Sequence, residues 1–238
     1  AAGPRRHEPR PNVVEKKLRA LSHCSVPRRL CFGMKTLLRI DAGARHSGSH
    51  SRALADHYER CWQKVHPGGR VIRRDLAANP PPHLDEATVA VFYAGGDPGN
   101  GPVPAGIRVS DTLIAELRAA DDVVVSSGVY NFNITSTLKA WIDHIVRFGH
   151  TIARGEDGRV SGLLGGRSVC VLFARGGNAQ TSPEYPGASL RALFQYIGFS
   201  RIEEICLEGT GIPDGKLPER LGAARAAVNA LFGLPVED

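Results

Sequence analysis

From Met34 to the end of the chain, short apolar runs alternate with amphipathic stretches of about ten to fifteen residues, and this alternation is what most constrains the fold. Runs rich in Val, Ile and Leu are typical of buried strands, whereas apolar residues at helical spacing indicate helices that pack on a sheet. The expected strands are 37–41, 70–74, 123–125, 168–173 and 202–207, and the expected helices are 51–64, 110–120, 134–148, 188–196 and 221–231. Such alternation builds parallel βαβ units, so the sequence predicts an α/β fold.

Five strands with intervening helices favour a flavodoxin-like, doubly wound five-stranded parallel sheet with helices on both faces. In such sheets ligands bind beyond the carboxyl ends of the strands, at the point where the strand order reverses. Residues 79–106 interrupt the alternation with three consecutive prolines and a glycine-rich stretch. A long irregular segment inside a compact domain is usually functional or mobile, and we expect this one to frame a substrate pocket.

The net charge of +6 resides in the first 33 residues. They hold eight basic and two acidic residues, so the rest of the chain is neutral overall and has no electrostatic reason to bind nucleic acid or an anionic membrane. Residues 1–33 are also rich in Arg and Pro and lack sustained apolar periodicity. We therefore expect a basic, disordered N-terminal extension at 1–33, before a single domain at 34–238 that begins at a natural start, Met34.

Cysteine usage and hydropathy exclude several classes of protein. The five cysteines are an odd number, with no CxxC pair and no Cys–His cluster, so neither a disulfide framework nor a structural zinc site is expected. The chain has no run of 18 apolar residues, which is the length that a helix needs to cross a bilayer. These features predict a protein of the reducing cytoplasm, with no membrane partner and no bound metal.

The turn after the first expected strand, residues 42–51, contains Gly, Ser and one Arg before a helix begins. Hydroxyls and N–H groups at a helix N-terminus bind phosphate. The turn has no Gly-Lys-Ser/Thr and no GxGxxG, so a single phosphate is a better candidate than a nucleoside triphosphate or a dinucleotide. An ordinary helix cap by serine, with Arg45 in solvent, is the alternative.

Two further turns follow apolar strands. Residues 126–133 carry Tyr130 and Phe132 with two asparagines, which suit a planar aromatic ligand, although both rings could instead belong to the core. Residues 174–178 carry Arg175 beside paired glycines, which allow a ligand to approach the backbone closely, or form a plain flexible turn.

Together the three turns resemble those of the FMN-dependent NADH-azoreductase family, also described as a quinone reductase family. The resemblance runs from Met34 to the C-terminus. The motifs that carry it are Tyr130-Asn131-Phe132-Asn133 with Leu138-Lys139 and Asp143, Gly162-Leu163 with Arg175-Gly176-Gly177, Arg74-Asp75-Leu76, and Ser49-His50-Ser51. A single motif of this kind is weak, but four in the right order at the right strand ends are fairly specific.

The resemblance implies non-covalent FMN, NADH or NADPH as electron donor, quinones and aromatic azo compounds as acceptors, and a homodimer with its active site near the subunit interface. It implies ping-pong hydride transfer and no catalytic side chain, since the flavin carries the redox chemistry. The implied flavin-binding residues are Gly43, Ser49, His50 and Ser51 at the phosphate, Val129, Tyr130, Asn131 and Phe132 along the ring, and Ala174, Arg175, Gly176 and Gly177 at its pyrimidine side.

The sequence departs from the family pattern in three places. Gly43 and Ala174 stand where serine is usual, and Gly128-Val129 replaces Pro-Met. The loss of a hydroxyl at Gly43 is expected to weaken FMN binding unless His46 or Ser47 compensates, because a hydrogen bond to a charged group contributes roughly 1.5–3 kcal/mol. A flavodoxin-like electron carrier and a flavin-free α/β domain with a degenerate phosphate turn remain the alternative functions.

Overall fold

The computed structural model describes residues 34–95, 99, 101–178 and 185–235. The expected N-terminal extension, 1–33, lies outside the described residues, so its boundary and its disorder stay predictions.

Five strands form one parallel sheet, as the sequence predicts. They are β1 (Thr36–Asp41), β2 (Arg70–Asp75), β3 (Asp122–Gly128), β6 (Ser168–Ala174) and β7 (Arg201–Leu207). Their order is β2-β1-β3-β6-β7, and every neighbouring pair is parallel. The chain order reverses between β1 and β3, which places the expected ligand site at the carboxyl ends of these strands.

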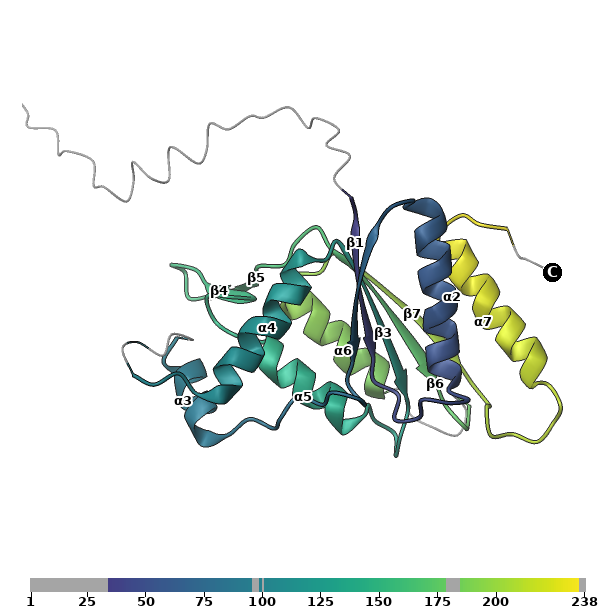
Figure 1. The fold of residues 1–238 in the computed structure, drawn as a ribbon, viewed down its shortest axis with the longest axis horizontal. Coiled ribbons are helices and arrows are strands. Elements are labelled where there is room, and N and C mark those ends of the chain that lie inside the picture. Colours follow the sequence, from purple (N-terminus) through teal and green to yellow (C-terminus); the bar gives the residue numbers. More distant parts are fainter. Residues whose placement is uncertain (1–33, 96–98, 100, 179–184, 236–238) are drawn as a thin grey trace, which may run out of the picture. The chain divides into compact units, whose positions relative to one another are not determined.

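Helices cover both faces of this sheet (Figure 1). On one face lie α2 (His50–Val65) and α7 (Leu217–Leu231), and on the other lie α4 (Ala105–Ala119), α5 (Ser136–Ile145) and α6 (Tyr185–Tyr196). No helix in the part of the chain that the structure describes is long and apolar enough to cross a membrane.

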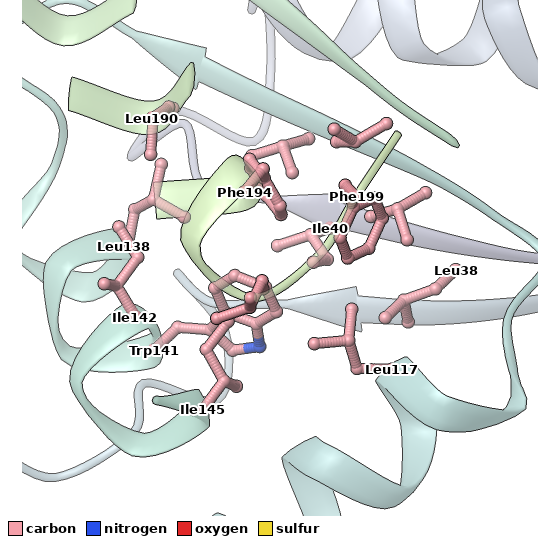
Figure 2. Close-up of a cluster of buried hydrophobic side chains, with 14 of the residues drawn as sticks. Leu38, Ile40, Leu117, Leu138, Trp141, Ile142, Ile145, Leu190, Phe194 and Phe199 are labelled. Carbon is pink, nitrogen blue, oxygen red and sulfur yellow. The ribbon is translucent and has the colours of Figure 1, made fainter. Parts of the chain in front are cut away.

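The two faces of the sheet bury separate apolar clusters because side chains alternate along a strand. Leu38 and Ile40 of β1 pack with α4, α5 and α6, in a cluster that includes Trp141 and Phe194 (Figure 2). Leu37, one residue earlier, packs with α2 and α7 on the opposite face. β1 is therefore buried on both sides, which fixes the position of the turn that follows it.

The described residues of segment 79–106 contain more regular structure than the sequence suggests. The segment contains helix α3 (Glu86–Tyr93). Asp85 caps the N-terminus of this helix, and its carboxylate accepts a hydrogen bond from the Thr88 N–H at 2.8 Å. α4 also begins earlier than expected, at Ala105, and its second residue, Gly106, lies so close to the Thr88 side chain that a Cβ there would clash with it. The expectation of an irregular segment was wrong for these residues, since the Asp85 cap signal was overlooked.

A short antiparallel pair was also missed. β4 (Ile152–Arg154) and β5 (Val160–Gly162) have three residues each, which is too short to show an alternating pattern. Gly158, with a φ of +78°, forms part of the connection between them.

Candidate functional site

The carboxyl ends of β1, β3 and β6 lie next to one another, and the turns that follow them line one cavity of about 250 Å³. One further residue comes from the loop after β7. The lining residues are Ala44, Arg45, Ser49, His50, Ser51, Gly128, Val129, Tyr130, Ala174, Gly176 and Thr210. The three turns named from the sequence thus share a single cavity at one edge of the sheet.

The turn between β1 and α2 brings two hydroxyls to the N-terminus of a 16-residue helix. Ser49 is the N-cap, and its Oγ accepts a hydrogen bond from the Arg52 N–H at 3.5 Å. The Oγ atoms of Ser49 and Ser51 lie 3.3 Å apart. The first N–H groups of a helix have no intrahelical partner and carry a partial positive charge, so this end of the cavity suits an anion.

Gly43 lies near these hydroxyls. A Cβ at Gly43 would stand 3.1 Å from Ser51 Oγ and 3.3 Å from Ser49 Oγ, so a larger residue here would crowd both hydroxyls. His46 and Ser47 are exposed and are not among the lining residues, whereas Ser49 and Ser51 are. On the turn after β1, the hydroxyls that line the cavity are therefore those of Ser49 and Ser51, and the expected compensation by His46 or Ser47 finds no support in the geometry.

A buried ionic network supports β1 beneath the cavity. Asp41 accepts hydrogen bonds from Ser126 Oγ at 2.7 Å and from Arg39 Nε at 2.9 Å. Burial lowers the pKa of Arg39, but the charges of Asp41 and Asp56 more than offset it and raise that pKa above its ordinary value. The Arg39 guanidinium thus stays charged in the core, beneath the turn that follows β1.

The turn after β3 closes on itself. The N–H of Tyr130 donates to the carbonyl of Asn133 at 2.9 Å, and the reverse hydrogen bond measures 3.0 Å. Asn131 and Phe132 between them have φ values of +48° and +66°, a left-handed conformation that is costly for a residue with a bulky side chain. The Tyr130 and Phe132 side chains are 43% and 54% exposed, so the turn presents two aromatic rings at the rim of the cavity.

The turn after β6 is braced by the loop after β7. The N–H groups of Gly209 and Gly211 donate to the carbonyls of Gly177 and Gly176 at 2.7 and 3.2 Å. A Cβ built on Gly176 would meet nothing within 4 Å, so this glycine leaves open space in the cavity. The backbone at Gly176 is therefore accessible to a flat ligand.

From the sequence we expected Arg175 at the flavin. Its charged side chain does not reach the cavity. It is 7% exposed, forms an ion pair with Glu208, and is not among the lining residues. Only the backbone of Arg175 remains at the turn, where its carbonyl accepts hydrogen bonds from the N–H and the Oγ1 of Thr210.

Seven of the twelve residues expected at the flavin line the cavity, namely Ser49, His50, Ser51, Val129, Tyr130, Ala174 and Gly176. The other five belong to the same three turns without lining it, namely Gly43, Asn131, Phe132, Arg175 and Gly177. Whether either group contacts a flavin stays a prediction. Arg45, whose place was left open between solvent and phosphate, lines the cavity while remaining exposed. Thr210 was missed, since the turn after the fifth strand had not been considered, although Gly209-Thr210-Gly211 is a small-residue signal of the same kind.

The composition of the cavity fits a flat molecule with a phosphate tail. Hydroxyls, a helix N-terminus and Arg45 gather after β1, whereas Ala174, Gly176 and Tyr130 lie after β3 and β6. FMN has this shape and polarity. Small-molecule cavities usually measure about 300–1,000 Å³, so a cavity of about 250 Å³ would leave part of such a ligand uncovered.

A larger depression of about 700 Å³ lies between α5 and α6, and Ile134, Leu193 and Tyr196 are among its lining residues. Its lining includes Ser136, the first residue of α5, but no glycine and no residue of a strand. Among the described residues no group of three or more His, Cys, Asp or Glu side chains could hold a metal ion. The cavity at the carboxyl edge of the sheet is therefore the stronger candidate.

Comparison with known proteins bears on the fold and on the family of the chain. A sequence model of the flavodoxin-like fold matches residues 34–231. An FMN-dependent NADH:quinone oxidoreductase of Xanthobacter autotrophicus is 42% identical over 177 residues, which cover 71% of this chain and 84% of that protein. FMN-dependent NADH:quinone oxidoreductase 6 of Burkholderia lata is 37% identical over 198 residues, which cover 83% of this chain and all of that protein.

Among solved structures, an azoreductase from Bacillus anthracis superposes with a TM-score of 0.74 at 22% sequence identity, covering 84% of this chain and 99% of its own. At this identity the likeness concerns the fold, and it agrees with the observed strand order and helix layers.

Proposed function

Because this chain belongs to the flavodoxin-like fold family, and there to the FMN-dependent NADH:quinone oxidoreductases, we propose that it is an FMN-dependent enzyme that passes electrons from NADH or NADPH to quinones and to aromatic azo compounds. The observation that carries the proposal is the single cavity shared by the serine turn after β1, the aromatic turn after β3 and the glycine turn after β6.

The flavin, when bound, supplies the capacity to take up and release a hydride, and the protein supplies binding and orientation. Ser49, Ser51 and the first turn of α2 hold the phosphate, and Arg45 adds a positive charge beside it. Gly176 admits the ring edge to the backbone, whose N–H groups stabilise negative charge without a dedicated acid. The lining residues include no Asp or Glu, and the lining imidazole, His50, belongs to the phosphate end of the cavity, so we assign no catalytic acid or base.

If one face of the flavin ring is uncovered, the nicotinamide and the acceptor can occupy it in turn. Such alternate occupation gives ping-pong kinetics. Tyr130 and Phe132 stand exposed at the rim, where they can stack on an aromatic substrate or contact a second copy of the chain. We propose a homodimer in which the second copy covers the remaining opening, in the reducing environment of the cytoplasm. Sedimentation of the full chain with FMN tests the dimer, and a monomeric flavoprotein with full turnover would refute it.

The decisive experiment is an absorbance spectrum of the full chain with FMN, before and after NADH. We expect a stoichiometric yellow complex that bleaches with NADH and recovers its colour on addition of benzoquinone. Binding of FMN without NADH oxidation would instead favour an electron carrier, and no binding at all would favour a flavin-free domain.

A substitution at Gly176 shows whether this cavity is the one that binds FMN. Gly176→Val fills open space, so we expect normal folding with loss of flavin binding. Gly165→Val is the matched control, because a Cβ at Gly165 also meets nothing within 4 Å, while this residue precedes β6 at the other end of the strand. Equal flavin binding by both variants would rule out the cavity.

A further inference from the structure

The loop between β1 and α2 is tied to the neighbouring strand β2 by one arginine. Arg52 Nη2 donates to the carbonyl oxygen of Gly43 at 2.9 Å. The same guanidinium makes two hydrogen bonds to Asp75, Nη1 to Oδ2 at 2.7 Å and Nη2 to Oδ1 at 2.9 Å. Arg52 thus joins the last residue of β2 to the second residue of the turn. Arg52 and Asp75 are 23 residues apart in the chain.

Asp75 is itself held in place. Its Oδ1 accepts hydrogen bonds from the backbone N–H groups of Ala77 and Ala78 at 2.9 and 3.1 Å. The hydrogen bonds from Arg52 hold the pKa of the Asp75 carboxyl well below its usual range, so the pair remains ionised. With the Arg52 side chain only 12% exposed, this pair is a fixed support rather than a mobile surface contact.

The guanidinium stands behind the cavity and does not line it. Its charge is balanced by Asp75 and by Asp41, whose Oδ2 lies 3.9 Å from Nη1. Arg52 is therefore poorly placed to act as the counter-ion of a phosphate. Its direct contact with the turn is through the carbonyl of Gly43, a residue that lies next to both serine hydroxyls with room for little more than its hydrogen atoms.

From this geometry we propose that Arg52, held by Asp75, is a positioning residue that sets the phosphate-binding turn and so determines the preference for FMN over riboflavin. The inference rests on the proposed function. Gly43 is the link: its carbonyl is fixed by Arg52, and it lies so near the two serines that a Cβ on it would stand 3.1 Å from Ser51 Oγ and 3.3 Å from Ser49 Oγ. Release of the carbonyl lets both hydroxyls move away from the phosphate, while the turns after β3 and β6, which would face the ring, keep their own supports.

The test compares two flavins on the same variants. In Arg52→Gln the dissociation constant of FMN, measured by flavin fluorescence quenching, should rise at least about tenfold, because hydrogen bonds to a charged phosphate are weakened. The dissociation constant of riboflavin, which has no phosphate, should stay within about twofold of the wild-type value. Arg52→Lys should fall between, because one ammonium group cannot contact Gly43 and both Asp75 oxygens together.

Arg74→Gln is the matched control. Arg74 is the neighbour of Asp75 on β2 and forms a comparable ion pair with Glu116, but it contacts neither Gly43 nor Arg52 in any hydrogen bond or ion pair of the described residues. We expect it to leave the ratio of the two dissociation constants unchanged.

The ratio also separates the possible failures. If Arg52→Gln leaves the ratio of the FMN and riboflavin dissociation constants unchanged, the positioning role is overturned, whether both constants stay the same or rise together. If the glutamine variant does not fold, the same ratio is measured in Arg52→Lys. A wild-type protein that binds both flavins equally overturns the phosphate assignment and this inference, yet leaves the flavin-dependent reaction standing. A wild-type protein that binds neither flavin overturns the proposed function, and the inference falls with it.

Discussion

Two turns meet at the same edge of the sheet and are stabilised in opposite ways. The turn after β1 is supported by ion pairs, chiefly the partly buried Arg52–Asp75 pair and the buried Arg39–Asp41 pair. The Tyr130–Asn133 turn after β3 is closed by two backbone hydrogen bonds and carries left-handed residues. The first arrangement suits an anchor for a small charged group, and the second suits an adjustable aromatic surface.

The contrast has an energetic consequence. Removal of one partner from a buried ion pair leaves an uncompensated charge and costs several kcal/mol. Removal of a side chain from a left-handed position relieves strain instead, because a left-handed conformation costs roughly 1–2 kcal/mol in an L-residue. Substitutions in the two turns should therefore change stability in opposite directions.

The largest effect is expected for Asp41→Ala. It strips Arg39 and Ser126 of a buried partner, although Arg39 keeps ion pairs with Asp56 and Glu59. We expect the free energy of unfolding without flavin to fall by about 3 kcal/mol, with a Tm roughly 6–12 °C lower by calorimetry. The control is Asp143→Ala, which removes an exposed pair with Lys139 and should change little. Equal losses in both variants would contradict the role of the buried network.

A smaller loss is expected for Asp75→Asn. The variant keeps the Oδ1 acceptor for the backbone but turns an amide toward Arg52 Nη1, and we expect a cost of about 1 kcal/mol in urea unfolding near pH 7. Because the pKa of Asp75 is lowered in the folded protein, its contribution is complete above the pKa of an unfolded aspartate, about 3.9. It is lost as the pH falls below that value toward the folded pKa.

The difference between wild type and Asp75→Asn should thus stay constant from pH 8 to pH 5 and shrink only in stronger acid. A difference that changes between pH 8 and pH 6 would mean that another group controls the pair.

The aromatic turn should respond in the opposite direction. Phe132→Gly removes a bulky residue at a φ of +66°, and we expect a gain of about 0.5 kcal/mol in unfolding free energy, since the flexibility of glycine offsets part of the relieved strain. NADH-dependent quinone turnover should fall, because the exposed ring is lost. Phe132→Leu keeps the strain without the ring, so it should lose turnover with no gain in stability. A glycine variant that is less stable than wild type would break the contrast between the two turns.

The fold could be predicted because its signals are local. Val123 to Val125 and Leu37 to Asp41 are apolar runs bounded by turn residues, and parallel sheets have few alternative arrangements. The position of the cavity followed from the rule that loops at the carboxyl ends of such strands meet.

The supports of the cavity could not be predicted, because their partners are distant in the chain. Arg52 occupies an unremarkable helix position, and nothing near it marks Asp75 as its partner 23 residues away. Arg175 was expected at the cavity for its charge, yet Glu208, which lies 33 residues further along, pairs with it and turns it inward. Such pairs depend on the register of neighbouring strands, which local patterns do not encode.

The smallest effect is expected at Gly43, whose carbonyl accepts a hydrogen bond from Arg52 and which lies near the two serine hydroxyls. If the turn already holds its hydroxyls well, an added methyl group can only crowd them, because a Cβ would stand 3.1 Å from Ser51 Oγ. We expect Gly43→Ala to fold normally and to weaken FMN binding by about twofold in a fluorescence titration, with riboflavin binding unchanged. Tighter FMN binding in this variant would show that the wild-type turn is loose, and that the ionic support behind it does not place the hydroxyls as proposed.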